Sequence, residues 1–224
     1  MLGVDRLDYT KGVQCRLEAF RYLLRRHPEL HRKIIFTQIL VPSRMDIPKY
    51  RSLKVEIDRM VGEINGEFTH GGWVPVHYIF SSLDQQELLA YYRTAEIGLI
   101  TPLKDGMNLV AKEYCACNLE STGVLILSQF AGAAAQLCRG ALLVNPYDIE
   151  GVAEAIHTAL ELSYEDRYAR MQKLRRNIRN QNVFWWMDSF LKIAFSKRLD
   201  DFPRQNVDEY YFSESSSADH VELC

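Results

Sequence analysis

The residues whose types suggest chemistry lie mainly in one stretch of this chain, Asp105-Gly-Met-Asn-Leu-Val-Ala-Lys-Glu113. An apolar run at 97–100 precedes it and a helical pattern opens at Met107, which predicts a strand, a tight turn and a helix start. A helix start presents unpaired N–H groups and the positive end of the helix dipole, so it favours an anion. Asp105 and Glu113 flank this position with carboxylates, which accept hydrogen bonds from hydroxyl groups. The order of hydroxyl, phosphate and hydroxyl partners suits a nucleotide-sugar.

Two further motifs accompany this stretch, Val4-Asp-Arg-Leu-Asp-Tyr-Thr-Lys-Gly12 upstream and Leu127-Ser-Gln-Phe-Ala-Gly-Ala-Ala134 downstream. With them the chain resembles the trehalose-6-phosphate synthases in one register from residue 1 to about residue 191. The resemblance covers only the C-terminal, donor-binding half of the two-domain GT-B fold of that family. It implies transfer of glucose from UDP-glucose to glucose-6-phosphate with retention of configuration, a step of trehalose biosynthesis.

Arg6 and Lys11 lie in the loop after the first expected strand, where doubly wound sheets bind ligands. A planar guanidinium and a mobile ammonium suit two linked phosphates. An arbitrary pair of this kind would more simply be a solvated basic loop. The resemblance implies instead that both contact the UDP diphosphate and stabilise the leaving group, so Arg6, Lys11 and Asp105 are the expected catalytic residues.

The resemblance also assigns the expected donor site. Asp105 would bind the glucose hydroxyls, although an aspartate before a glycine is also explained by turn formation. Glu113 would accept from the ribose hydroxyls, and the alternative is a surface glutamate. The backbone amides beside Asp105 complete the site, and they belong to Gly106, Met107, Asn108, Leu109 and Val110. The Leu109 and Val110 amides would face phosphate. The alternative role of these residues is packing of their side chains under the helix, and both roles can hold together.

Two other groups of contacts follow from the resemblance. Ser82, Leu83 and Leu88 fall where the family holds the uracil ring, and their alternative role is a helix cap and core leucines. Arg44 follows Pro42-Ser43 and would reach the phosphate of glucose-6-phosphate. The alternative for Arg44 is a surface charge in a turn.

The remainder of the chain alternates apolar runs with amphipathic segments, which predicts an α/β fold with a doubly wound, Rossmann-like parallel sheet. Strands are expected near 1–4, 33–41, 76–80, 96–103, 123–127 and 141–144. Helices are expected at 13–26, 48–64, after Ser82 or Asp84, from 107, in the alanine-rich segment near 134, and at 149–162, 164–180 and 183–198. We predict one domain at 1–198 and a flexible tail at 199–224. The dinucleotide fingerprint Gly-x-Gly-x-x-Gly is absent, which disfavours an NAD-dependent enzyme.

Composition limits the function classes. The 224 residues carry a net charge of −2, which argues against a general nucleic-acid or membrane-surface role. We expect no membrane span, no signal peptide and a cytoplasmic location. The five cysteines form no zinc-ligand pattern and the six histidines are scattered, so neither a metal nor a cofactor is expected, only UDP-glucose as donor substrate.

Most of the acceptor pocket belongs, by the resemblance, to an N-terminal domain with no counterpart here. That domain, or homologous subunits, is therefore an expected partner, and the chain alone is expected to be inactive. Two alternatives stay open. One is a non-catalytic or regulatory module that binds nucleotide-sugar, and the other is a sister transferase such as glucosylglycerol-phosphate synthase or a pseudo-glycosyltransferase.

Overall fold

The structure, a computed structural model, describes residues 1–195. The predicted tail at 199–224 lies outside the described residues. The chain divides into two compact units, Met1–Arg175 and Arg176–Cys224. The predicted single domain at 1–198 therefore stays a prediction. No helix in the described part is long and apolar enough to cross a bilayer.

The first unit is built on a six-stranded parallel sheet with the strand order β3-β2-β1-β4-β5-β6. Its strands are β1 (Leu2–Arg6), β2 (Phe36–Val41), β3 (Val76–Ile79), β4 (Ile97–Ile100), β5 (Val124–Ser128) and β6 (Leu142–Val144). The order reverses between β1 and β4, which pair at Leu2 and Gly98. This arrangement confirms the predicted doubly wound α/β fold.

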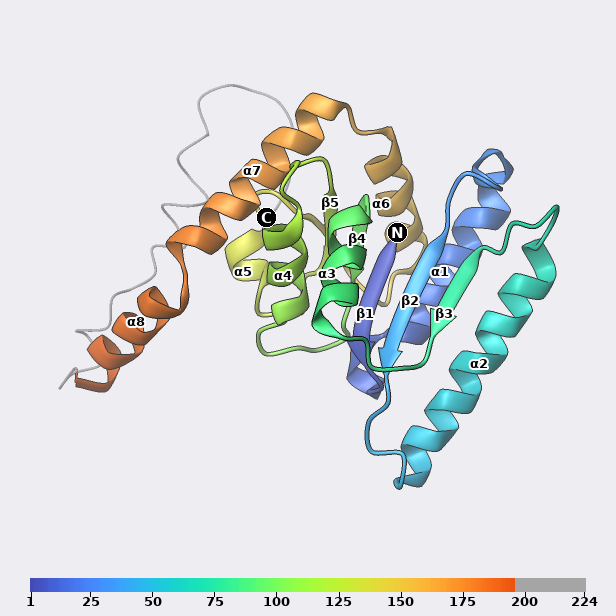
Figure 1. The fold of residues 1–224 in the computed structure, drawn as a ribbon, viewed down its shortest axis with the longest axis horizontal. Coiled ribbons are helices and arrows are strands. Elements are labelled where there is room, and N and C mark those ends of the chain that lie inside the picture. The colour runs from blue at the N-terminus through green and yellow to red at the C-terminus, as the bar shows by residue number, and fades with distance from the viewer. Residues whose placement is uncertain (196–224) are drawn as a thin grey trace. The chain divides into compact units, whose positions relative to one another are not determined.

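Helices cover both faces of the sheet (Figure 1). Helix α1 packs against α2 and α6, and α3 packs against α4. The helices of this unit are α1 (Val13–Arg26), α2 (Pro48–Phe68), α3 (Gln85–Thr94), α4 (Leu109–Cys117), α5 (Ala134–Leu137) and α6 (Ile149–Glu161). Helix α7 (Tyr164–Asn180) runs into the second unit, which also contains α8 (Val183–Phe195).

Local sequence signals explain most of these elements. Strands β4 and β5 are buried along their whole length, which is why they read as continuous apolar runs rather than as alternating ones. Helix α3 begins with a capping box in which Asp84 and Glu87 each bond the other's backbone N–H. Asp84 rather than Ser82 is therefore the cap. Helix α2 continues past its expected end at residue 64 to Phe68, because its packed face outweighs the low helix propensity of Gly66.

Gly98 in β4 leaves the space that the buried Tyr114 ring fills. A Cβ at this position would lie 2.7 Å from the Tyr114 ring. We expect Gly98→Ala to lower the free energy of unfolding by about 1–3 kcal/mol, measured by urea denaturation, because the core is overpacked. Gly62→Ala in α2 is the matched control, since a Cβ there meets no atom within 4 Å. That control should raise stability by about 0.5–1 kcal/mol. Equal urea midpoints for Gly98→Ala and the unsubstituted chain would contradict the packing argument.

Candidate functional site

The loops after β1 and β4 meet at the point where the strand order reverses, the usual ligand site of such sheets. Lys11 comes from the first loop and Asp105 from the second. Lys11 Nζ lies 2.6 Å from Asp105 Oδ2, and both side chains are mostly buried. The Thr10 carbonyl also accepts from the Leu103 amide at 2.7 Å. The structure thus joins two of the three expected catalytic side chains directly.

A short 3-10 turn, η1 (Tyr9–Lys11), presents Lys11. Asp8 caps this turn, because its Oδ1 accepts from the Thr10 amide at 2.9 Å and from Thr10 Oγ1 at 2.8 Å. Gly12 ends the turn with φ +66°, and a Cβ at Gly12 would lie 2.6 Å from the Thr101 carbonyl oxygen. Both the left-handed backbone and this close approach require glycine.

Asp105 accepts several hydrogen bonds in addition to that from Lys11. Its Oδ2 accepts from Asn108 Nδ2 at 3.2 Å, and its Oδ1 accepts from the Met107 amide at 3.4 Å. Partial burial alone would raise the pKa of Asp105, but the hydrogen bond and charge of Lys11, together with the hydrogen bonds from the Met107 amide and Asn108, outweigh burial and hold the pKa below its usual value. Asp105 is therefore ionised at neutral pH and accepts hydrogen bonds rather than donating one.

Helix α4 begins at Leu109, two residues later than the expected opening at Met107. Asn108 is the cap, with φ +72°, and its Oδ1 accepts from the Ala111 amide at 2.9 Å. The amides of Leu109 and Val110 have no partner within the helix, since they precede its first intrahelical bonds. The alternative role of packing under the helix does not apply to the Leu109 side chain, because this residue is 57% exposed. Val110 is half-buried.

The loop after β5 fixes the backbone of the stretch around Asp105. The Gly132 amide donates to the Asp105 carbonyl at 2.9 Å, and the Ala133 amide donates to the Met107 carbonyl at 2.7 Å. A Cβ at Gly132 would lie 2.1 Å from the Gly106 carbonyl oxygen, so only glycine allows the two loops to touch. The downstream Phe-Ala-Gly-Ala motif thus supports the loop that carries Asp105.

A buried network beneath the two loops was missed by the sequence analysis. Arg16 of α1 is 1% exposed and donates to Asp5 Oδ2 at 2.7 Å, to Gln38 Oε1 at 3.1 Å and to Thr101 Oγ1 at 3.0 Å. It also donates to the Lys11 carbonyl at 3.1 Å. One signal could have revealed it, since Arg16 lies on the apolar stripe of its helix.

Arg6 and Arg44 differ in how firmly they are held. Arg6 is exposed and makes no ion pair with the residues described. Arg44 has φ +48° and donates to the hydroxyl of buried Tyr50 at 3.1 Å. The Tyr50 hydroxyl in turn donates to Asp8 Oδ2 at 3.2 Å. The loop after β2 is thereby connected to the loop that carries Lys11, so Arg44 is more than a free surface charge.

Glu113 and the expected uracil contacts lie around α3. The hydroxyl of buried Tyr92 donates to Glu113 Oε2 at 2.9 Å, and burial followed by the Glu113 charge raises the pKa of Tyr92. Ser82 is exposed and does not cap the helix. Leu83 and Leu88 are half-buried rather than core residues. Within residues 1–195, no hydrogen bond links these three to the Lys11–Asp105 pair.

Comparisons with known proteins agree with one another. The model of Glycosyltransferase family 20 matches residues 1–195. The alpha,alpha-trehalose-phosphate synthase [UDP-forming] A of Dictyostelium discoideum is 43% identical over 192 residues, which cover 86% of this chain and 26% of the relative. The trehalose-6-phosphate synthase of Mycobacterium avium is 47% identical over 191 residues, 85% of this chain and 39% of the relative.

Solved structures show the same partial match. A Burkholderia xenovorans alpha,alpha-trehalose-phosphate synthase (UDP-forming) in complex with glucose-6-phosphate gives a TM-score of 0.84 at 42% identity. The match covers 87% of this chain and 43% of that one. An E. coli structure bound with UDP-2-fluoro glucose gives a TM-score of 0.82 at 41% identity. That match covers 85% of this chain and 42% of the E. coli chain. The chain therefore spans less than half the length of these relatives.

Replacing Arg16 tests the buried network. Arg16→Met leaves the Asp5 carboxylate buried without its cation, so we expect the free energy of unfolding to fall by about 3–5 kcal/mol in urea denaturation. Neutralising the orphaned acid in Asp5→Asn/Arg16→Met should recover part of this loss. If Arg16→Met alone is as stable as the unsubstituted chain, the network does not hold the loops.

The Lys11–Asp105 pair should make stability depend on pH. A carboxyl group with a depressed folded pKa stabilises the fold above its unfolded value of about 3.9, and the contribution is lost as pH falls through the folded pKa. The stability difference between the unsubstituted chain and Lys11→Met should therefore keep its full value from about pH 7 to about pH 5 and shrink as the pH falls below about 4. Lys33→Met, at an exposed lysine, should show no such trend. A constant difference for Lys11→Met across this range would contradict the pairing.

Proposed function

Because the chain belongs to Glycosyltransferase family 20, we propose that it supplies the donor-binding half of a retaining GT-B transferase. The donor would be UDP-glucose, the acceptor glucose-6-phosphate and the product trehalose-6-phosphate. The observation that carries the proposal is the Lys11–Asp105 pair, held at 2.6 Å beside the open amides at the start of α4. A cation, free N–H groups and an ionised acceptor match the diphosphate and the sugar of one nucleotide-sugar.

The cationic side chains and the amides at the start of α4 would bind the diphosphate of the donor. An ammonium has three donors, so Lys11 can keep its bond to Asp105 and still turn toward a phosphate. Arg6, exposed and without an ion-pair partner among residues 1–195, supplies the second cation for the departing UDP. The Leu109 and Val110 amides complete the anion site. Stabilising charge on the leaving group in a preorganised site is an established source of rate enhancement.

The hydroxyl groups of the glucose and of the ribose need hydrogen-bond acceptors on the protein. Asp105 would bind the glucose hydroxyls together with the backbone of Gly106, Met107 and Asn108. Glu113, oriented by Tyr92, would accept from the ribose. Ser82, Leu83 and Leu88 would hold the uracil ring at the carboxyl end of β3. The E. coli relative bound with UDP-2-fluoro glucose supports this class of donor.

On the acceptor side, Arg44 would hold the phosphate of glucose-6-phosphate, and the complex of the Burkholderia xenovorans relative supports that acceptor. The rest of the acceptor pocket would come from an N-terminal domain or a partner subunit, since the chain spans 43% of that relative. We propose no cofactor for the reaction. The cytoplasmic location expected from the sequence stays a prediction.

Titration calorimetry tests donor binding. We expect the purified chain to bind UDP and UDP-glucose saturably and to prefer them over ADP-glucose. Asp105→Ala and Arg6→Ala should each weaken UDP-glucose binding about 10- to 100-fold, because a charge-assisted hydrogen bond contributes about 1.5–3 kcal/mol. Arg59→Ala removes an exposed arginine in the middle of α2 and is the matched control. Unchanged affinity in both site variants, with intact circular dichroism, would refute the assigned site.

A turnover assay tests the half-site proposal. We expect the chain alone to form trehalose-6-phosphate at least about 1,000-fold more slowly than a two-domain relative, because it lacks most groups that would orient the acceptor. A comparable rate would overturn the proposal that this chain carries only the donor half. Donor binding without turnover, even when an acceptor domain is added, would favour the non-catalytic module.

A further inference from the structure

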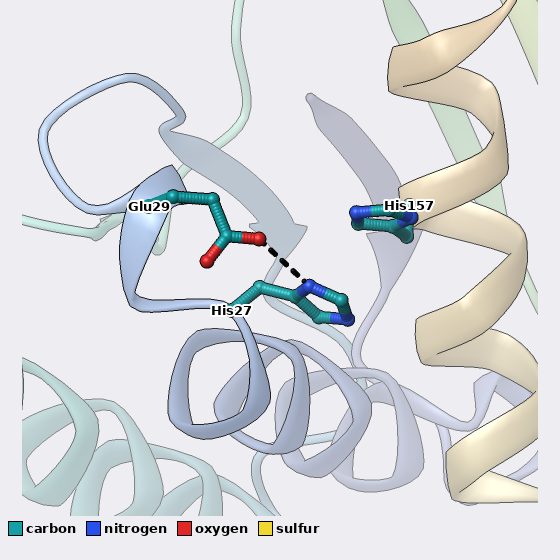
Figure 2. A group of neighbouring side chains, drawn as sticks. All are labelled: His27, Glu29 and His157. Carbon is teal, nitrogen blue, oxygen red and sulfur yellow. Dashed lines mark hydrogen bonds and ion pairs between the residues drawn. The ribbon is translucent and has the colours of Figure 1, made fainter.

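A second cluster of chemically capable side chains lies far from the Lys11–Asp105 pair. His27, which follows the last turn of α1, faces His157 of α6, and Glu29 of the 3-10 turn η2 (Pro28–Leu30) lies beside them (Figure 2). Helix α1 has 14 residues, so its end lies about 20 Å along the helix from the end near Lys11. The cluster plays no part in the donor site.

The three side chains are close enough to share one ligand. His27 Nδ1 lies 2.9 Å from Glu29 Oε1. The rings of His27 and His157 stack with centroids 4.0 Å apart and planes inclined by 25°. One potential ligand atom from each of the three residues lies within 4.8 Å of the other two. Both histidines are half-buried and Glu29 is exposed, so an ion can reach the cluster from solvent.

We propose that His27, Glu29 and His157 form a binding site for a divalent transition-metal ion of the Zn²⁺ type. Two imidazole nitrogens and one carboxylate oxygen are a common ligand set for such ions, and hard ions such as Mg²⁺ prefer oxygen ligands alone. Water would occupy the fourth position. A metal ion would replace the direct contact between His27 Nδ1 and Glu29 Oε1.

The cluster needs only side-chain rotation to close around an ion. Tetrahedral bonds of about 2.0–2.1 Å place ligand atoms roughly 3.3 Å apart, compared with the present limit of 4.8 Å. The nitrogen lone pairs of the two stacked rings lie in nearly parallel planes with ring centroids 4.0 Å apart, so they do not converge on one ion until one ring turns. Rotamer changes of exposed side chains take only picoseconds to nanoseconds. The backbone of α1 and α6 can stay in place.

The surroundings of His157 support its use as a ligand. Its Nδ1 lies 3.5 Å from Glu161 Oε2, one turn later on α6. A carboxylate that accepts a hydrogen bond from one ring nitrogen orients the imidazole and leaves the other nitrogen to bind metal, and Glu161 lies close enough to take this role when an ion binds. The nearby cation Arg26 is already paired with Glu154 at 3.4 Å. The local charge therefore favours a bound cation.

Such an ion would tie the end of α1 to α6, two helices that already pack against each other. The unfolded chain holds His27 and His157 far apart, so it does not offer the same site. An ion bound only by the folded chain raises the unfolding temperature as its concentration rises. The proposed role of the site is therefore structural, and it is independent of donor binding.

The test is titration of the full, chelator-treated chain with ZnCl₂ near neutral pH, followed by calorimetry and by thermal unfolding. We expect one saturable site per chain and a rise in Tm. His27→Gln and His157→Gln should each weaken that site at least about tenfold and remove the rise in Tm, because each loses an imidazole ligand. Glu29→Gln should weaken it less, since water can replace the carboxylate.

His77→Gln and His70→Gln are the matched controls, because both histidines are exposed and lie on other elements. Both controls should bind Zn²⁺ as the unsubstituted chain does. Circular dichroism verifies that each variant is folded, and His157→Gln carries the test if His27→Gln is not. Failure of the unsubstituted chain to bind Zn²⁺, or undiminished binding by His157→Gln, would overturn the proposal. Loss of binding in His70→Gln would move the site elsewhere and overturn it as well.

Discussion

The carboxyl edge of the sheet depends on one buried cation. Arg16 donates to Asp5, Gln38 and Thr101, which belong to or follow β1, β2 and β4, and to the carbonyl of Lys11. A buried guanidinium is tolerated only when its donors are satisfied, so these partners must stay in place together. Even the absence of a side chain at Gly3 serves this arrangement, because a Cβ there would lie 2.5 Å from Arg16 Nη1. The two loops that form the candidate site rest on this network.

Much of the fold could be predicted because the positions of buried apolar residues differ between strands covered on both faces and amphipathic helices. Strands β4 and β5, covered on both faces, read as apolar runs, and α1 reads as an amphipathic helix with the bounds 13–26 that the structure shows. The start of α4 was misplaced because Asn108 adopts a left-handed backbone, which periodicity does not reveal. Arg16 was missed for a related reason, since pattern reasoning assigns arginine to the solvent side.

The candidate site was predictable where chain neighbours or topology bring residues together. The stretch from Asp105 is local in sequence, and the rule for doubly wound sheets predicts that Lys11 lies near it. Other pairings depend on how the side chains of different helices pack. The Tyr92–Glu113 bond and the stacking of His27 on His157 are of this kind, and scattered histidines gave no signal of it. The exposed Leu109 side chain shows the same limit, because a motif defines which residue is present but not which way it points.

The pairing of Lys11 with Asp105 also shapes the field that an approaching ligand meets. Two opposite charges 2.6 Å apart nearly cancel beyond a few ångströms, so the pair has little influence at a distance. Arg6, exposed and without an ion-pair partner among residues 1–195, projects its full charge into solvent. Attraction of an anion during diffusion, and the sensitivity of that attraction to salt, would then come from exposed cations such as Arg6 rather than from Lys11. Lys11 would act only after contact, which separates the kinetics of encounter from the strength of the bound state.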